Sequence, residues 1–233
     1  MIPIRDDIPS ETYPFVNYGL IALNFIVFLY ELSLPPIQLT NFIYNFGFVP
    51  FKFSYILGCG HCSMLQAILP IFSSMFIHGG WFHILGNMLF LYIFGDNVED
   101  SLGHLKYLIF YLLSGFAAAM FQYVIHPFSK TPMVGASGAI AGVLGAYFIL
   151  YPRARVFTLV FFFFFVDIIP LPAFLYIFLW FLMQVLNGSA ALALQGAGGV
   201  AWWAHIGGFI AGMTMVLLIR KKQRPRYRYY RPW

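Results

Sequence analysis

Charged residues are scarce in this chain. Only 9% of its 233 residues are Asp, Glu, Lys or Arg, whereas a soluble domain has roughly 25%. Hydrophobic residues make up 61%, and the mean hydropathy is +0.80. This shortage of charge excludes an ordinary soluble domain and indicates one compact domain embedded in a membrane.

Cysteine is also nearly absent, because the chain has two, both in the sequence CGHC at 59–62. Two cysteines and His61 are one ligand short of a structural zinc site. The same motif in disulfide isomerases needs a thioredoxin-type fold, and this sequence does not predict the required alternation of strands and helices. A local disulfide or two free thiols is favoured, while a partial or intermolecular metal site and a redox function stay open. We expect no cofactor and no metal in the functional site.

Long apolar segments divide the chain into six predicted membrane-spanning helices. An apolar stretch at 156–169 has only about 14 residues and contains Asp167, so we predict an interfacial or re-entrant segment, with a seventh span as the alternative. Residues 37–77 form a long loop, and His104 and His126 are expected in loops at the ends of the third span. The predicted fold is an all-α polytopic domain, residues 1–219, with spans at about 15–34, 81–95, 107–125, 135–151, 172–187 and 202–219.

Lysine and arginine set the expected orientation, because loops rich in them stay in the cytoplasm. Seven follow residue 219, and Arg153 and Arg155 follow the fourth span, whereas the long loop has only Lys52. Six spans then place both termini in the cytoplasm and the long loop outside. We expect a multi-pass protein of a bacterial cell inner membrane, with the basic, aromatic tail 220–233 on anionic lipid headgroups. Nucleic-acid binding is disfavoured, because these basic residues form no folded surface of their own.

Polar side chains in the predicted spans gather at one depth. The second, fourth and sixth spans all run inward, and near their outer ends they carry His83 and Asn87, Ser137, and His205, respectively. Polar groups at such positions are costly to bury and tend to be functional. His83 and Asn87 share a helix face, so both can stabilise an oxyanion together with the Ser137 N–H. Interhelical hydrogen bonding is the structural alternative for this pair.

Glycines predict close packing of the fourth and sixth spans. The fourth contains Gly138-x-x-x-Gly142 and the sixth contains Gly208-x-x-x-Gly212, and such spacing lets helix backbones approach. If the two grooves pack together, the hydroxyl and imidazole beside them come within hydrogen-bond distance. That is the arrangement of an activated nucleophile and its base.

A third, acidic member of a triad is not predicted. Glu31 falls at the outer end of the first span, distant from the site in sequence, and the other acids fall on the cytoplasmic side. We therefore predict a Ser–His dyad, with the imidazole held by aromatic packing. Trp202 and Trp203 are candidates for this packing, although an interfacial aromatic belt explains them equally well.

Three motifs in this order, HGGWFHILGN (78–87), GASG (135–138) and AHIGG (204–208), and the run GNMLFLYIFGDNVED resemble the rhomboid family of intramembrane serine proteases. The resemblance covers about residues 15–219. It implies a six-helix bundle with a serine–histidine dyad that opens to the outer side. It also implies roles for seven residues: Ser137 as nucleophile, His205 as base, His83 and Asn87 as the oxyanion-stabilising pair, His78 as a support, and Gly135 and Gly138 flanking the nucleophile.

One feature departs from the family pattern. Many relatives carry a Trp-Arg pair in the first loop, but here this region reads CSMLQAILPIFSSMF, without arginine, so another contact must hold the loop. The insertion at 156–169 also separates the serine from the histidine by more residues than in the smallest members.

The expected function is an intramembrane serine endopeptidase that forms an acyl-enzyme and cleaves membrane proteins near the outer end of a transmembrane helix. The expected partners are such single-pass or polytopic substrates and the lipid bilayer. An inactive rhomboid-like protein that binds membrane clients is the main alternative. A small transporter is the other, although the chain lacks the intramembrane acid and the internal repeat that would favour it.

Overall fold

A computed structural model describes residues 1–59, 61–162, 165–193 and 200–219, so the predicted tail 220–233 lies outside the described residues. A helix is present at each of the six predicted positions. These helices are α1 (Phe15–Ser33), α5 (Trp81–Leu102), α6 (His104–Ile125), α7 (Ser137–Leu150), α8 (Ala173–Ala193) and α9 (Trp202–Ile219). Four of them are long and apolar enough to cross a membrane, namely α1, α6, α8 and α9.

A fifth candidate span is bent. The first loop ends in α4 (Met64–Ser73) and the 3-10 helix η1 (Ser74–Phe76), which meet α5 at 83°. The remaining predicted span, α7, is apolar but has only 14 residues.

The core of the bundle is built around α7. Residues Ala139 to Tyr147 of this helix are all buried, and α9, α6 and α5 pack around it. The predicted glycine packing is confirmed. A Cβ placed on Gly208 would lie 2.1 Å from the carbonyl oxygen of Gly138, and one on Gly212 would lie 2.1 Å from that of Gly142. Only glycine at these positions of α9 permits this backbone approach.

The acidic run DNVED lies inside α5, not after it, so the predicted end of this span at residue 95 is wrong. Glu99 is fully buried and accepts hydrogen bonds from the backbone N–H groups of Val16 and Asn17, 3.0 and 2.7 Å away. It therefore caps the first turn of α1, which has no side-chain cap of its own. His104 also contacts Glu99. It is the first residue of α6 and not a loop residue.

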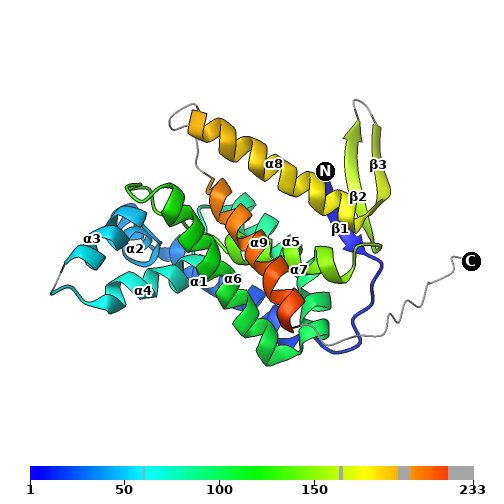
Figure 1. Cartoon of the computed structure of the whole chain (residues 1–233), viewed down its shortest axis with the longest axis horizontal. Helices are drawn as coiled ribbons and strands as arrows, with labels where there is room; N and C mark the ends of the chain where they lie inside the picture. The colour runs from blue at the N-terminus through cyan, green and yellow to red at the C-terminus, as the bar shows by residue number, and fades with distance from the viewer. Residues whose placement is uncertain (60, 163–164, 194–199, 220–233) are drawn as a thin grey trace, which may run out of the picture.

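Antiparallel strands at 155–162 and 165–172 form a β-hairpin, which corrects the prediction of an all-α fold. The interfacial or re-entrant position of this segment stays a prediction. Strands β2 (Arg155–Phe162) and β3 (Phe165–Pro172) pair antiparallel, and β1 (Ile2–Asp6) pairs antiparallel with the other edge of β2. Aromatic and β-branched residues favour such a pleated surface. Val156 and Thr158 are buried while the residues between and beyond them are more exposed, as a strand period of two requires. Figure 1 shows this sheet beside the N-terminal end of α8.

The long first loop is mostly helical. It contains α2 (Pro36–Phe46), α3 (Pro50–Gly58), α4 and η1, and in Figure 1 α2 to α4 lie on the side of the bundle opposite the sheet. Cys59 and Cys62 form a disulfide in the turn between α3 and α4. Of the two favoured possibilities for CGHC, the structure has the local disulfide and not the free thiols.

Candidate active site

Ser137 and His205 meet at the ends of two packed helices. Ser137 is the first residue of α7, and His205 lies in the first turn of α9. The imidazole Nε2 is 2.8 Å from the serine Oγ. The predicted hydrogen-bond distance is confirmed, and it follows from the close approach of Gly208 to the Gly138 carbonyl one turn below.

The other ring nitrogen of His205 has a partner that sequence reasoning missed. Its Nδ1 is 2.9 Å from the side-chain oxygen Oε1 of Gln184 on α8, and the Gln184 amide nitrogen donates to the Trp180 carbonyl at 3.0 Å. This second bond orients the amide, so its oxygen faces the ring. His205 then carries its proton on Nδ1 and presents the unprotonated Nε2 to the Ser137 hydroxyl. A signal existed in the sequence, because Gln184 is one of two amide side chains in an apolar predicted span.

Aromatic packing around His205 differs in part from the prediction. The Trp202 ring meets the imidazole edge-on with 6.2 Å between centroids, as expected, and Trp180 lies 6.1 Å away. Trp203 packs against Phe121 instead. The imidazole is therefore held by one predicted and one unpredicted tryptophan, in addition to the glutamine.

His83 and Asn87 face the backbone that precedes Ser137. The Gly79 N–H lies 3.3 Å from His83 Nδ1 and donates to it, which places the proton of the neutral ring on Nε2. A Cβ on Gly135 would lie 2.6 Å from this Nε2 and 3.5 Å from Asn87 Nδ2. Gly135 also has φ +119°, a conformation that favours glycine. Both side chains thus point donors at the space beside the serine.

The amide nitrogen of Asn87 is a free donor at this site. It is buried and makes no hydrogen bond with the described residues. A buried donor without a partner costs free energy, and this one lines the cavity that contains Ser137 and His205. The arrangement fits an amide N–H that finds a hydrogen-bond acceptor only when an oxygen atom of a ligand occupies the cavity.

Glu31 and His78 support this region from behind. The backbone N–H of His78 donates to both carboxyl oxygens of Glu31, 3.1 and 3.3 Å away, and the His78 ring packs edge-on against His83 with 5.1 Å between centroids. Its place in the sequence suggested that Glu31 is distant from the site. In the structure it lies next to the site's supporting residues. The position of His78 fits the predicted support role. The other flanking glycine, Gly138, lets α7 approach α6, since a Cβ there would lie 2.7 Å from that of Ala118.

A cavity of about 520 Å³ opens onto these groups. His83, Asn87, Ser137 and His205 all line it, together with apolar side chains such as Phe90 and Trp180. Its size is in the range of pockets that hold part of an extended ligand. Among the residues that the structure describes, no three His, Cys, Asp or Glu side chains are grouped as a metal site.

Comparison with known proteins agrees with the motifs. The Rhomboid domain family matches residues 65–222, which is more than half of the chain. The chain belongs to the rhomboid family. It is therefore an integral, multi-pass membrane protein whose helices include the four or five candidate spans described above.

Three relatives illustrate the extent of the similarity. Rhomboid protein 1, mitochondrial, of Saccharomyces cerevisiae is 32% identical over 165 residues, 68% of this chain and 44% of the relative. In Arabidopsis thaliana, RHOMBOID-like protein 5 is 28% identical over 173 residues, 70% of this chain and 47% of the relative. Rhomboid-like protein 11, chloroplastic, is 29% identical over 154 residues, 64% and 51%. The chain spans about half the length of these relatives.

The first loop of this rhomboid shows what holds it without the arginine. The Ser73 hydroxyl donates to the Phe46 carbonyl at 2.6 Å, which ties α4 to α2. The backbone N–H of Gly135 donates to the Ser74 carbonyl at 2.8 Å, and Phe48 and Met133 exchange two backbone hydrogen bonds. Backbone and serine contacts therefore join the loop to the segment that precedes Ser137.

Proposed function

We propose that this rhomboid is an intramembrane serine endopeptidase. The 2.8 Å contact between Ser137 Oγ and His205 Nε2 carries this proposal, because a hydroxyl bonded to an unprotonated imidazole nitrogen is the arrangement of an activated nucleophile. The cavity around this contact and the donors of His83 and Asn87 support the same function.

The reaction follows from the geometry. As the Ser137 oxygen attacks the peptide carbonyl carbon, His205 Nε2 takes the hydroxyl proton. The carbonyl oxygen becomes an oxyanion, which the Asn87 amide, the His83 Nε2–H and the Ser137 backbone N–H stabilise. His205 then gives its proton to the leaving amine, and the acyl-enzyme forms. Water attacks this ester with His205 again as base, and the acid product leaves with Ser137 restored.

The depth of the serine suggests where a substrate is cut. Helix α7 has 14 residues, or about 21 Å, against a hydrocarbon core of ~30 Å. With its C-terminal end at the cytoplasmic interface, Ser137 lies below the outer surface and is reached through the cavity. A substrate helix must unwind near its outer end to present a peptide bond there, because helical carbonyls are already bonded. Substrates are therefore single-pass or polytopic membrane proteins.

The orientation is part of this proposal. Six crossings, with α5 and the short α7 included, put both termini in the cytoplasm and the disulfide-containing loop outside. The Cys59–Cys62 disulfide supports this, because disulfides persist outside the reducing cytoplasm. The tail 220–233 then faces anionic cytoplasmic lipid.

A fluorophosphonate probe and a model transmembrane substrate test the function with purified protein. The probe should label the parent and not Ser137→Ala, and both Ser137→Ala and His205→Ala should lower cleavage to background. The double variant should be no worse than either alone, since the two residues act as one unit.

Asn87→Ala should be milder, with a loss of at most ~10²–10³ in rate, because other oxyanion donors remain. All variants should still insert and purify, and Ser137→Ala, which deletes a single oxygen, should keep the parent's thermal unfolding temperature. Substantial cleavage by Ser137→Ala would exclude this mechanism. Absence of labelling in a folded parent would favour an inactive client-binding protein.

A further inference from the structure

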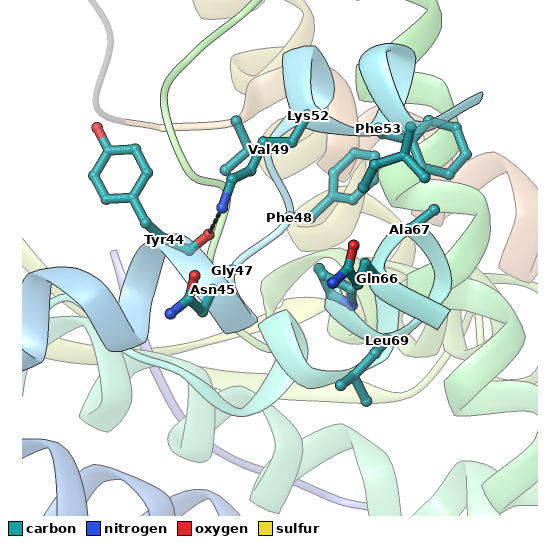
Figure 2. Close-up of a pocket in the computed structure, with 12 residues that line it drawn as sticks. Tyr44, Asn45, Gly47, Phe48, Val49, Lys52, Phe53, Gln66, Ala67 and Leu69 are labelled. Carbon is teal, nitrogen blue, oxygen red and sulfur yellow. Dashed lines mark hydrogen bonds between the residues drawn. The ribbon is translucent and has the colours of Figure 1, made fainter. Parts of the chain in front are cut away.

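A second cavity lies in the first loop, outside the proposed active site. It has a volume of about 340 Å³ and is enclosed by α2, α3 and α4 (Figure 2). One side is apolar and is formed by Phe53, Ile56 and Leu69. The proposed proteolysis does not involve this cavity. The residues that line it indicate which class of ligand fits.

The other side of this cavity is polar and basic. Figure 2 shows Lys52 reaching across to Tyr44, whose backbone carbonyl accepts one of its ammonium protons at 2.7 Å. Two ammonium protons are left for a ligand. The side-chain amides of Asn45 and Gln66 also line the cavity. No acidic side chain of the described residues does so, and Lys52 is the only Lys or Arg between Arg5 and Lys106 in the sequence. One cation with two neutral amides favours an anion.

Helices α2, α3 and α4 form one helical unit, and its outer surface is suited to lipid and not to water. Ile37, Tyr55 and Leu65 are 79%, 66% and 66% exposed, and such large apolar side chains mark a membrane or protein contact when they are this exposed. The unit is fixed to the predicted outer end of α6, where the Ser54 hydroxyl lies 3.2 Å from the Tyr123 hydroxyl. Tyrosines and a lysine with an apolar stem are typical of the membrane interface.

We propose that this cavity binds an anionic phospholipid of the outer leaflet. The phosphate lies against the Lys52 ammonium and the amides of Asn45 and Gln66, and the first methylenes of an acyl chain lie along Phe53 and Leu69. A volume of this size accommodates a headgroup and part of a chain, but not a whole lipid, which leaves the remaining chain in the bilayer. The assignment to the outer leaflet rests on the proposed orientation.

The cavity is also linked to the segment before the nucleophile. Its wall includes Gly47 and Phe48, and the Phe48 N–H donates to the Met133 carbonyl at 3.0 Å while the Met133 N–H donates back at 2.7 Å. Val134 touches the same wall, since a Cβ on Gly47 would lie 3.0 Å from its Cγ1. A bound lipid therefore stabilises the segment that leads into Gly135, and we expect the same lipid to raise the rate of the proposed reaction.

Binding is measured by native mass spectrometry of the full chain in detergent. The probes are dioctanoyl phosphatidylglycerol, dioctanoyl phosphatidylcholine and inorganic phosphate. We expect the anionic lipid to bind about tenfold more tightly than the zwitterionic one, because the choline cation of the latter offsets the attraction between Lys52 and the phosphate that both lipids carry. Lys52→Met keeps the apolar stem and removes this preference. Lys130→Met is the matched control, because Lys130 lies over the nearby Phe51 ring, 5.2 Å from its centroid, but does not line the cavity.

A second variant tests whether the lipid binds in this cavity and leaves the charge of Lys52 unchanged. Gln66 is exposed on α4, so Gln66→Trp fills the cavity at little risk to folding and should weaken binding of both lipids. The proposal is overturned if Lys52→Met keeps the preference, if Lys130→Met removes it equally, or if Gln66→Trp binds both lipids like the parent. It is also overturned if inorganic phosphate binds as tightly as the anionic lipid. These readouts need no proteolysis, so failure of the probe labelling above would leave them intact.

Discussion

Gln184→Leu tests whether a neutral amide orients the imidazole of His205 as the aspartate does in a Ser-His-Asp triad. Gln184 is 4% exposed and accepts the Nδ1 proton of His205 at 2.9 Å. Leucine has a similar volume but no acceptor, so the change removes the bond with little loss of packing. The imidazole then loses the contact that keeps its proton on Nδ1, and Nε2 faces the serine unprotonated for a smaller fraction of the time.

The size of the effect follows from one buried hydrogen bond. Leaving a buried donor without its partner costs about 1–3 kcal/mol. The part of this cost that is felt only in the transition state lowers kcat, so the loss is at most roughly 5- to 150-fold. The loss should be smaller than the ~10⁴-fold caused by removing the charge of a triad aspartate, because glutamine carries no charge to stabilise the imidazolium. Gln184 does not line the active-site cavity, so KM should be unchanged. In the proposed mechanism, Gln184 is thus a positioning residue and not a catalytic residue.

Steady-state cleavage of a purified transmembrane substrate separates kcat from KM, and the pH–rate profile reports whether the base has changed. Gln184→Glu keeps an oxygen acceptor at the same reach and serves as the conservative variant. It should retain more activity than Gln184→Leu and shift the profile. A leucine variant that cleaves at the parent rate would refute the orienting role. Equal losses in both variants, with a lowered unfolding temperature, would show that Gln184 only packs α8 against α9.

Three further predictions concern the rest of the chain. A C-terminal tag should be protected from protease added outside intact cells, and its cleavage would contradict the six crossings and the cytoplasmic tail. The Cys59→Ser/Cys62→Ser variant should keep most proteolytic activity, because neither sulfur lines the active-site cavity; a loss as large as that of the nucleophile variant would show that the loop's bridge is part of the working site. Burial raises the pKa of Asp6 from 3.8 to about 7, with added repulsion from Asp96. Since this folded-state pKa lies above the unfolded one, the folded protein binds the extra proton, and unfolding temperatures in detergent should fall as pH rises from about 4 to 7. Asp6→Asn should flatten this dependence, whereas a slope equal to the parent's would contradict it; Asp7→Asn, at an exposed carboxyl, is the control.

The contact between Ser137 and His205 could be predicted from the sequence because the cost of burying polar groups is a local property. Ser137 and His205 stand out as hydroxyl and imidazole in apolar segments, and the glycine spacing of 138–142 and 208–212 predicts which backbones approach. Mean hydropathy and segment length similarly predict where helices form. None of these inferences depends on which helices and strands are neighbours in the folded chain.

Partners far apart in the chain could not be predicted in this way. The pairing of β1 with β2 joins residues about 150 positions apart, and an apolar stretch such as 156–169 has no periodicity that separates a buried strand from a short interfacial helix.

Tertiary packing alone decided three further contacts, one in the bundle and two at the candidate site and its supports. It decided that Glu99 caps α1, that Glu31 binds the His78 backbone, and that Gln184, not an acid, meets His205. A side chain's own sequence neighbourhood sets how costly its burial is, but the group that offsets this cost comes from another helix. Only the packing of the helices decides which group that is.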